Sequence, residues 1–350
     1  MIGLGINLRK YLFVAVITVL LGATYFYRAT WLPVYNEFVV GHNYVAPKVG
    51  ADFVVAFEPV KDAFHPFIQQ MITQAFPEYN VVFDDSVSRP NLIVLTDGMR
   101  SADSRYKGLD IPYITYSGEP KNLPRRRYRT RGLPLAQIVV FKPENDQQIY
   151  VPFYLWSGVE LNTNVVREVD PNKKFLIYVS ENCVKHREEF FALVKKSNDQ
   201  VDAFGKCSNT AGGQRAPGGY GDLTPLYSQY NFVMAMENSQ KPGYVSEKIF
   251  NAFNSGAIPI YWGDSEVVNG IFNSKAYIDL SQYKSFAAAV QHLNELVQDQ
   301  EKLAQIKMEP ILAENAKPWS LVVAGEGYLA QHAAKLRQLY DAKVKGGWSL

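Results

Sequence analysis

The sequence predicts an α/β protein made of two halves, each built on a parallel β-sheet. Short apolar runs alternate with segments of helical spacing along the chain after residue 50. Strand, helix, strand order indicates parallel pairing, because a crossover helix brings the chain back to start the next strand in the same direction. A length of 350 residues is also long for one domain, and a polar stretch at residues 161–174 divides the alternating pattern in two.

The first half begins with the apolar run FVVAF at residues 53–57, which predicts a buried strand. A helical pattern and three more strand-like runs follow, at residues 67–76, 81–83, 92–95 and 111–116. The last run stops at Ser117, Gly118 and Glu119. A carboxylate therefore stands at a strand end, beside a flexible glycine.

The second half opens with a strand over residues 175–179, followed by a helix whose first turn contains Arg187. A cation is disfavoured at the amino end of a helix unless an anion binds nearby, so this position indicates an anion site. The remaining patterns predict a strand at 201–204, another at 277–280, and helices at 286–297, 303–312 and 328–340.

The most informative stretch of the second half runs from residue 230 to residue 263. It predicts a strand over 232–236, a polar loop, a helix from Ser246 that Gly256 ends, and a second strand over 257–262. In open parallel sheets, ligands bind beyond the carboxyl ends of the strands, where helix amino ends present free N–H groups to anions. The stretch alone therefore predicts an anion or nucleotide site, with Glu247 and Lys248 in the first turn of the helix.

Composition excludes several other classes of protein. Apolar residues make up 47% and charged residues 20% of the chain, as in a globular protein with a sizeable core. A formal net charge of +2 is too small for a general nucleic-acid binder. Cys183 and Cys207 are the only cysteines, which allows one disulfide but no cysteine-only zinc site. No D-x-D pair stands at a convincing strand end, so no obligatory metal is predicted, and stimulation by a divalent cation stays open.

The N-terminus predicts a membrane anchor over residues 1–30. Arg9 and Lys10 precede the uncharged, mostly apolar residues 11–27, and Arg28 closes this segment. A cleaved signal peptide is the competing interpretation, but no clear small-residue cleavage site follows. We expect a short stem over residues 31–50 and the rest of the protein on the side away from the cytosol.

An arginine run in the first half allows two interpretations. Arg125, Arg126 and Arg127 begin a run with five arginines in seven positions. Such a run is either a solvated loop or a clamp for phosphate or an acidic acceptor, since the guanidinium fork binds such anions with two hydrogen bonds. Nucleic-acid binding is disfavoured, because one loop lacks the wider basic face that it requires.

Two ordered sequence blocks in the second half are distinctive: YVSENCVKHREEFFALVKK followed by VDAFGKC, and then MENSQKPGYVSEKIFNAFNSGAIPIYWG. The second block resembles the donor-binding signature of the α-1,3-fucosyltransferases, which form glycosyltransferase family 10, and the first block resembles the segment that precedes that signature. Together the blocks cover about residues 175 to 280. The first half matches more loosely, through YITYSGEP and YVPFYLW.

The resemblance implies a GT-B fold of two Rossmann-like domains that face each other across a cleft. An acceptor-side domain would then occupy residues 51–160, a linker 161–174, a domain for GDP-fucose 175–320, and a C-terminal helix 321–350. Some eukaryotic members carry cysteines where this chain has Cys183 and Cys207, which implies a disulfide in an oxidising compartment. A single-pass type II protein of the Golgi membrane would be expected in a eukaryote, and one of the cell membrane in a bacterium.

The resemblance also assigns roles to individual residues. Arg187 and Lys248 would hold the diphosphate, while the fucose, ribose or guanine portions of the donor would contact Asn238, Tyr244 and Glu247. Glu119 matches the carboxylate of the family's T-G-E motif and would deprotonate the acceptor hydroxyl. The alternative for Glu119 is an ordinary turn glutamate.

The function that the resemblance implies is inverting transfer of fucose from GDP-fucose to a hydroxyl, O3, of an N-acetylglucosamine or glucose residue. The acceptor would be a glycoprotein, a glycolipid or an oligosaccharide. The chain departs from the family's pattern after Glu119, where the arginine run replaces an aromatic and acidic pattern, and this departure leaves the acceptor open. Two alternatives also stay open: a non-catalytic nucleotide-binding or glycan-binding protein of the same fold, and a transferase that uses another GDP-sugar.

Overall fold

A computed structural model describes residues 44–58, 66–96, 105–106, 109–120, 133–157, 159–208, 215–217, 222–316 and 326–344. The expected anchor over residues 1–30 lies outside these residues, as do Arg125, Arg126 and Arg127. Within the described part, no helix combines the length and the apolar character needed to cross a membrane. Internal contacts divide the chain after residue 45, and the architecture below is that of the unit formed by residues 46–350.

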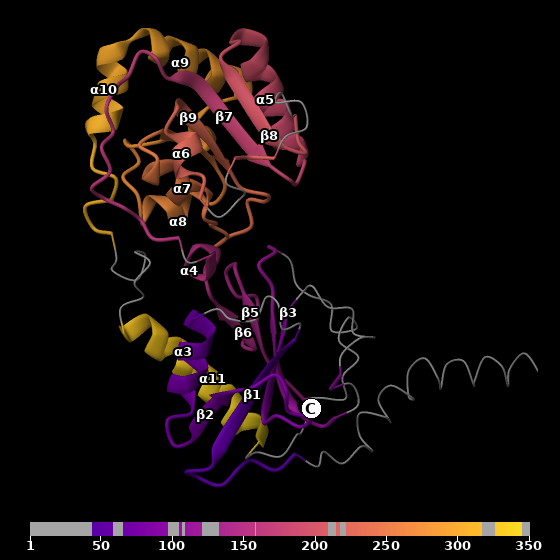
Figure 1. The fold of residues 1–350 in the computed structure, drawn as a ribbon. Coiled ribbons are helices and arrows are strands. Elements are labelled where there is room, and N and C mark those ends of the chain that lie inside the picture. Colours follow the sequence, from indigo (N-terminus) through magenta and orange to yellow (C-terminus); the bar gives the residue numbers. More distant parts are fainter. Residues whose placement is uncertain are drawn as a thin grey trace, which may run out of the picture. The chain divides into compact units, whose positions relative to one another are not determined.

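The first sheet contains six described strands, all paired in parallel (Figure 1). In chain order they are β1 (Asp52–Glu58), β2 (Asn80–Phe83), β3 (Leu92–Thr96), β4 (Pro112–Tyr116), β5 (Leu133–Val139) and β6 (Gln148–Tyr150). Their order across the sheet is β2-β1-β3-β4-β5-β6. The strands predicted at residues 53–57, 81–83, 92–95 and 111–116 are confirmed.

The second sheet contains five described strands, again parallel, in the order β11-β10-β9-β7-β8. They are β7 (Lys174–Ser180), β8 (Val201–Gly205), β9 (Tyr230–Met236), β10 (Ile258–Trp262) and β11 (Ile278–Asp279). The strand order reverses between β7 and β9, because the chain first adds β8 on one side of β7 and then crosses to the other. Ligands in doubly wound sheets bind in the crevice at such a reversal.

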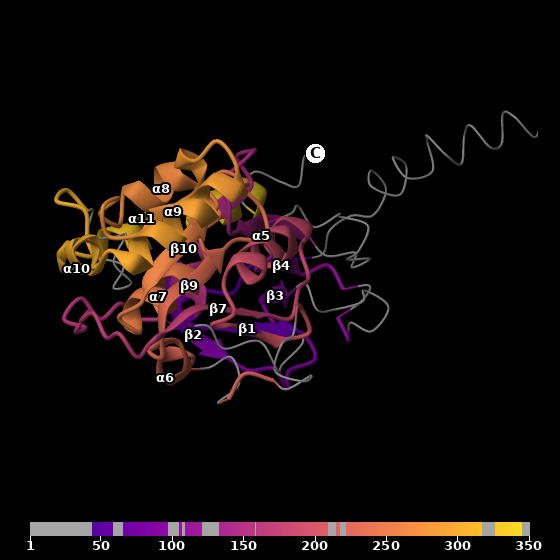
Figure 2. The same ribbon diagram turned by 90° about the horizontal axis from the view of Figure 1, so that it is seen from above.

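Helices cover both faces of the second sheet. They are α5 (Lys185–Ser197), α6 (Thr224–Tyr227), α7 (Lys248–Asn254), α8 (Ser265–Asn269), α9 (Phe286–Gln298) and α10 (Gln300–Met308), with a 3₁₀ turn, η4, at Leu280–Gln282. Figures 1 and 2 show α9 beside α5 and α7 beside β9. Every residue of β9 is buried, as expected for a central strand of a parallel sheet covered on both sides.

Two predicted helices differ from the structure at one end. The helix after Ser246 begins only at Lys248, but it ends as predicted before Gly256, whose φ of +74° favours glycine. A Cβ at Gly256 would also lie 2.6 Å from the carbonyl oxygen of Val166. The helix predicted over 303–312 ends at Met308, because Pro310 restricts the backbone of the residue before it.

The last described helix, α11 (Glu326–Val344), packs on the first half of the unit. It contacts α3 (Pro66–Ala75), β5 and β6, and Figure 1 shows the yellow α11 beside the indigo α3. The Tyr340 ring lies 4.9 Å from the Phe76 ring, and Arg337 forms a 2.6 Å ion pair with Glu78. The sequence pattern predicted this helix but not its packing partner.

Candidate functional site

Polar residues that follow β7 and β9 meet at the edge of the second sheet where the strand order reverses. After β7, four residues lead into α5, whose first turn contains Arg187. After β9, the β9–α7 loop (residues 237–247) leads into Lys248. Because the two strands are parallel neighbours, their carboxyl ends bring both segments together.

Arg187 is a buried cation with unused hydrogen-bond donors. Arg187 is only 2% exposed, and its Nη1 donates to Ser180 Oγ at 3.4 Å. Its Nε and Nη2 donate to none of the described residues. Buried donors without partners cost free energy, and an oxyanion would satisfy them with charge-assisted bonds. Arg187 therefore has the features of an anion ligand.

A second cluster is centred on Glu237, which is completely buried. Its Oε1 accepts a hydrogen bond from the Ser246 N–H at 2.7 Å, and its Oε2 accepts one from Ser246 Oγ at 2.7 Å. Lys248 Nζ lies 2.9 Å from Ser246 Oγ and 3.6 Å from Glu237 Oε2. Burial raises the pKa of Glu237, and the Lys248 ammonium opposes that rise. The buried carboxyl thus fixes the position of Lys248.

The sequence prediction left Glu237 and Ser246 out of the site. Glu237 directly follows a strand in which all seven residues are buried. A carboxyl group in that position needs partners inside the protein, since burial of an unpaired charge is costly. This was the signal in the sequence that could have identified both residues.

Two buried acceptor atoms lie at the same edge. Glu247 Oε1 is 3.4 Å from Lys248 Nζ, whereas Glu247 Oε2 accepts no hydrogen bond from the described residues. Asn238 Oδ1 is also buried and lacks a described partner. Hydroxyl groups of a sugar could donate to both atoms. The edge therefore offers cationic donors for an anion and acceptors for hydroxyls.

Tyr244 of the β9–α7 loop has a pKa that responds to charges from both halves of the unit, Glu119 among them. The tyrosine is 3% exposed, and burial is the main cause that raises its pKa. The carboxylates of Glu237, Glu247 and Glu119 raise the pKa further, while Arg187 lowers it. The charge of Glu119 therefore acts on the same tyrosine as the charges of Glu237, Glu247 and Arg187. Glu119 follows β4 of the first sheet, and its N–H donates to Ser117 Oγ at 3.1 Å.

His186 and Trp262 form an aromatic pair that the sequence prediction missed. Their rings stack with centroids 3.8 Å apart, and His186 Nε2 lies 2.9 Å from the carbonyl oxygen of Glu237. A carbonyl only accepts, so Nε2 carries the proton in this bond. Burial lowers the pKa of His186, which favours the neutral imidazole. The pair links α5 to the end of β10 beside the β9–α7 loop.

Cys183 and Cys207 form a disulfide with a Cα–Cα distance of 5.1 Å. It joins the segment that leads into α5 to the residues that follow β8. The bridge therefore restrains the backbone just before Arg187. Among the described residues, no group of three or more histidine, cysteine or acidic side chains could hold a metal ion.

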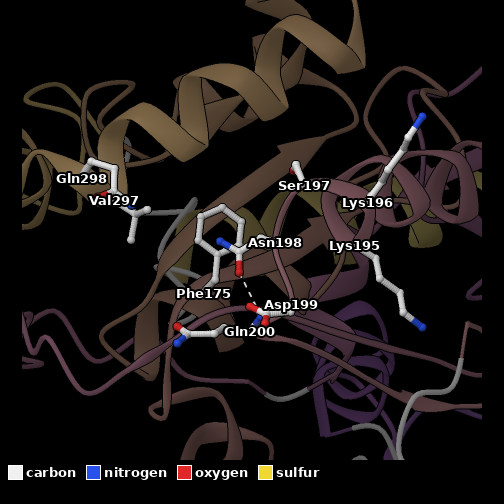
Figure 3. A pocket seen from close by; sticks show the side chains of 9 residues that line it. All are labelled: Phe175, Lys195, Lys196, Ser197, Asn198, Asp199, Gln200, Val297 and Gln298. Atoms are coloured by element: carbon white, nitrogen blue, oxygen red, sulfur yellow. Dashed lines mark hydrogen bonds between the residues drawn. The ribbon is translucent and has the colours of Figure 1, made fainter.

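A pocket of about 520 Å³ lies elsewhere on the second half (Figure 3). Its lining belongs to the carboxyl end of α5, the amino end of β7 and the end of α9: Phe175, Lys195, Lys196, Ser197, Asn198, Asp199, Gln200, Val297 and Gln298. Figure 3 shows the two lysine side chains directed away from Phe175, and Asn198 Oδ1 already accepts the Gln200 N–H at 2.9 Å. The pocket lacks converging polar groups and lies at the opposite edge of the sheet from Arg187.

Comparison with known proteins confirms the resemblance. Residues 169–306 match the family described as glycosyltransferase family 10 (fucosyltransferase), C-terminal part. The α-(1,3)-fucosyltransferase FucT of Helicobacter pylori is 33% identical over 130 residues, 37% of this chain and 26% of the relative. A fucosyltransferase-like protein of Acanthamoeba polyphaga mimivirus, R654, is 34% identical over 172 residues, 47% of this chain and 28% of the relative. The chain thus spans about a quarter of the length of these relatives.

Solved structures show the same fold over a larger part of the chain. A crystal structure of an α1,3-fucosyltransferase aligns with a TM-score of 0.61 and 18% identity, and covers 84% of this chain and 92% of the solved one. A crystal structure of an α1,3-fucosyltransferase with GDP-fucose aligns with a TM-score of 0.59 and 19% identity. The alignment covers 84% of this chain and 92% of the solved one. The predicted α/β fold with two parallel sheets is therefore confirmed.

Proposed function

We propose that this chain, whose residues 169–306 match glycosyltransferase family 10, transfers fucose from GDP-fucose to a hydroxyl group of a glycan. The observation that supports the proposal most is the buried Arg187, which has two unused donors at the strand-order reversal of the second sheet. A solved structure with the same fold is that of an α1,3-fucosyltransferase with GDP-fucose, which supports GDP-fucose as the donor.

The diphosphate of the donor would bind between Arg187 and Lys248. A guanidinium donates two parallel hydrogen bonds to phosphate, and the Lys248 ammonium adds a second positive charge. Negative charge grows on the β-phosphate as GDP departs. Cations held in place before the reaction stabilise that charge without rearranging, and Glu237 with Ser246 holds Lys248 in this way.

The fucose hydroxyls would donate to the unused acceptors. Glu247 Oε2 and Asn238 Oδ1 are both buried and lack described partners, so each would gain a hydrogen bond when a sugar binds. Such contacts would fix the orientation of the fucose ring in the site. Orientation of the reacting atoms is a large part of the rate gain in a transfer between two bound substrates.

Glu119 would act as the base for the acceptor. In an inverting transfer, one carboxylate takes the proton from the attacking hydroxyl while positive charge develops at the anomeric carbon. Glu119 comes from the first half, where the acceptor would bind, and its charge acts on Tyr244 of the β9–α7 loop. We propose O3 of an N-acetylglucosamine or glucose residue as the acceptor position.

Calorimetry with GDP-fucose, GDP-mannose and UDP-galactose tests the donor assignment. We expect GDP-fucose to bind, GDP-mannose to bind more weakly because its hydroxyls point differently, and UDP-galactose to give no measurable heat. Equal affinity for the UDP-sugar and the GDP-sugar would reject a GDP-fucose site. Tighter binding of GDP-mannose would instead assign another GDP-sugar.

A further inference from the structure

The β9–α7 loop is bonded to the first half of the unit as well as to the second. The Lys142 N–H donates to the Pro242 carbonyl at 2.7 Å, and the Tyr150 hydroxyl donates to the Gly243 carbonyl at 2.6 Å. From the second half, the Gly243 N–H donates to Asp264 Oδ2 at 2.6 Å. Gly243 is therefore held by both halves through its own N–H and carbonyl groups.

The fit around Gly243 admits only glycine. Its φ is +85°, in the region that side chains disfavour. A Cβ at this position would lie 2.4 Å from the Lys142 nitrogen and 3.0 Å from the carbonyl carbon of Phe141. The backbones of the two halves thus touch directly at this point.

Side chains next to Gly243 strengthen the same contact. Lys241 Nζ lies 3.0 Å from Glu144 Oε1 and 3.5 Å from the centre of the Phe141 ring. Tyr244 packs in an apolar cluster with Val139, Val140, Phe141 and Phe153. Residues 139–150, which join β5 to β6, therefore contact the loop on both sides of Gly243.

We propose that Tyr150 is a positioning residue for the donor site, an inference that rests on the proposed function. Its hydroxyl holds Gly243, which directly precedes Tyr244 and lies three residues before Ser246. With the loop ordered before the donor arrives, the donor does not have to supply the free energy that ordering costs. His332 Nε2 bonds to the Tyr150 carbonyl, so α11 fixes the backbone that presents this hydroxyl.

Tyr150→Phe tests the proposal, because it removes the hydroxyl and keeps the ring. We expect the dissociation constant for GDP and the KM for GDP-fucose to rise roughly three- to tenfold, the range set by one lost hydrogen bond, with kcat changed less than about twofold. Tyr230→Phe is the matched control. It loses an equally short bond, 2.6 Å to Asp202 Oδ2, at the amino end of β9. We expect it to leave the affinity for GDP unchanged.

Hydrogen exchange without ligand gives an independent measurement. Tyr150→Phe should speed amide exchange in residues 239–247 relative to wild type and Tyr230→Phe, with β7 unchanged. Unchanged exchange in this loop, or an equal loss of GDP affinity in both variants, would overturn the positioning role. The wild-type protein could bind no GDP while Tyr150→Phe still exchanges faster in this loop. That result would reject the proposed function and the role of Tyr150 in donor binding, and would support only the contact between Tyr150 and Gly243.

Discussion

The Tyr150 hydroxyl donates to the carbonyl oxygen of Gly243 across 2.6 Å, between residues 93 positions apart in the chain. Tyr150 ends β6 of the first sheet, and Gly243 lies in the loop that follows β9 of the second. The loop that carries Tyr244 and Glu247 is therefore shaped by both halves. Substitutions in residues 139–150 should affect the donor site although none of those residues lies in the matched family segment.

Arg187→Met should abolish donor binding without weakening the fold. The variant removes a buried cation whose Nε and Nη2 have no described partner, and replaces it by an apolar chain of similar length. We expect the melting temperature without ligand to stay equal or rise, since a buried unsatisfied group is removed. The increase in melting temperature that GDP produces in the wild type should disappear.

Arg337→Met is the matched control for this substitution. Arg337 forms one ion pair with Glu78 at 2.6 Å and another with Asp341 at 2.9 Å. Its replacement should lower the melting temperature and leave the shift caused by GDP intact. A normal GDP shift in Arg187→Met would remove Arg187 from the diphosphate site.

Glu119→Gln should separate catalysis from donor binding. The amide cannot take a proton from the acceptor hydroxyl, so kcat should fall roughly 10²- to 10⁴-fold, as expected for loss of a general base. GDP affinity by calorimetry should stay within about twofold of wild type, because the donor cations are untouched. The exposed Glu160, replaced by Gln, serves as the control. Turnover of Glu119→Gln equal to that of this control would exclude Glu119 as the base.

Lys307 should make stability depend on pH above neutrality. Lys307 is 4% exposed, and burial lowers the pKa of its ammonium group from 10.5 to about 8. Between pH 8 and 10.5 the unfolded chain binds more protons at this group than the folded one, so the contribution of Lys307 to stability rises with pH. Below pH 8 the folded protein keeps a buried ammonium, at a cost on the order of 3 kcal/mol.

Lys307→Met removes this cost together with the bond from Nζ to the Glu168 carbonyl at 2.9 Å. Thermal unfolding from pH 7 to 10 should show the stability of the variant relative to wild type decreasing as pH rises. Lys302→Met is the control, since Lys302 is exposed and pairs with Asp299 at 2.9 Å. A difference between Lys307→Met and wild type that is constant over this range would contradict the lowered pKa.

Periodicity predicted most of the second sheet, because its strands are uniformly apolar and end in polar residues. The run over residues 232–236 became β9, and the polar residues after it form the β9–α7 loop. Arg187 could be predicted as a site residue for a different local reason, because a cation in the first turn of a helix is disfavoured by the helix dipole. Its burial beside Ser180, by contrast, depends on tertiary packing.

Contacts between segments far apart in sequence could not be predicted. No local sequence pattern indicates that α11 packs against α3. The apolar side chains of α11 could pack on any apolar surface of the protein. His186 is an ordinary residue in the sequence, and only the fold stacks it on Trp262. The fit of Gly243 against Lys142 likewise exists only when both halves are assembled.

Transfer of fucose tests the central claim most directly. The protein would be incubated with GDP-fucose and a panel that includes N-acetyllactosamine and a chitobiose-core acceptor, with GDP release and product linkage measured together. We predict release of GDP in proportion to a fucosylated product whose new bond has the configuration opposite to that of the donor. GDP-fucose that stays intact with every acceptor of the panel would contradict the assignment of this chain as a fucosyltransferase.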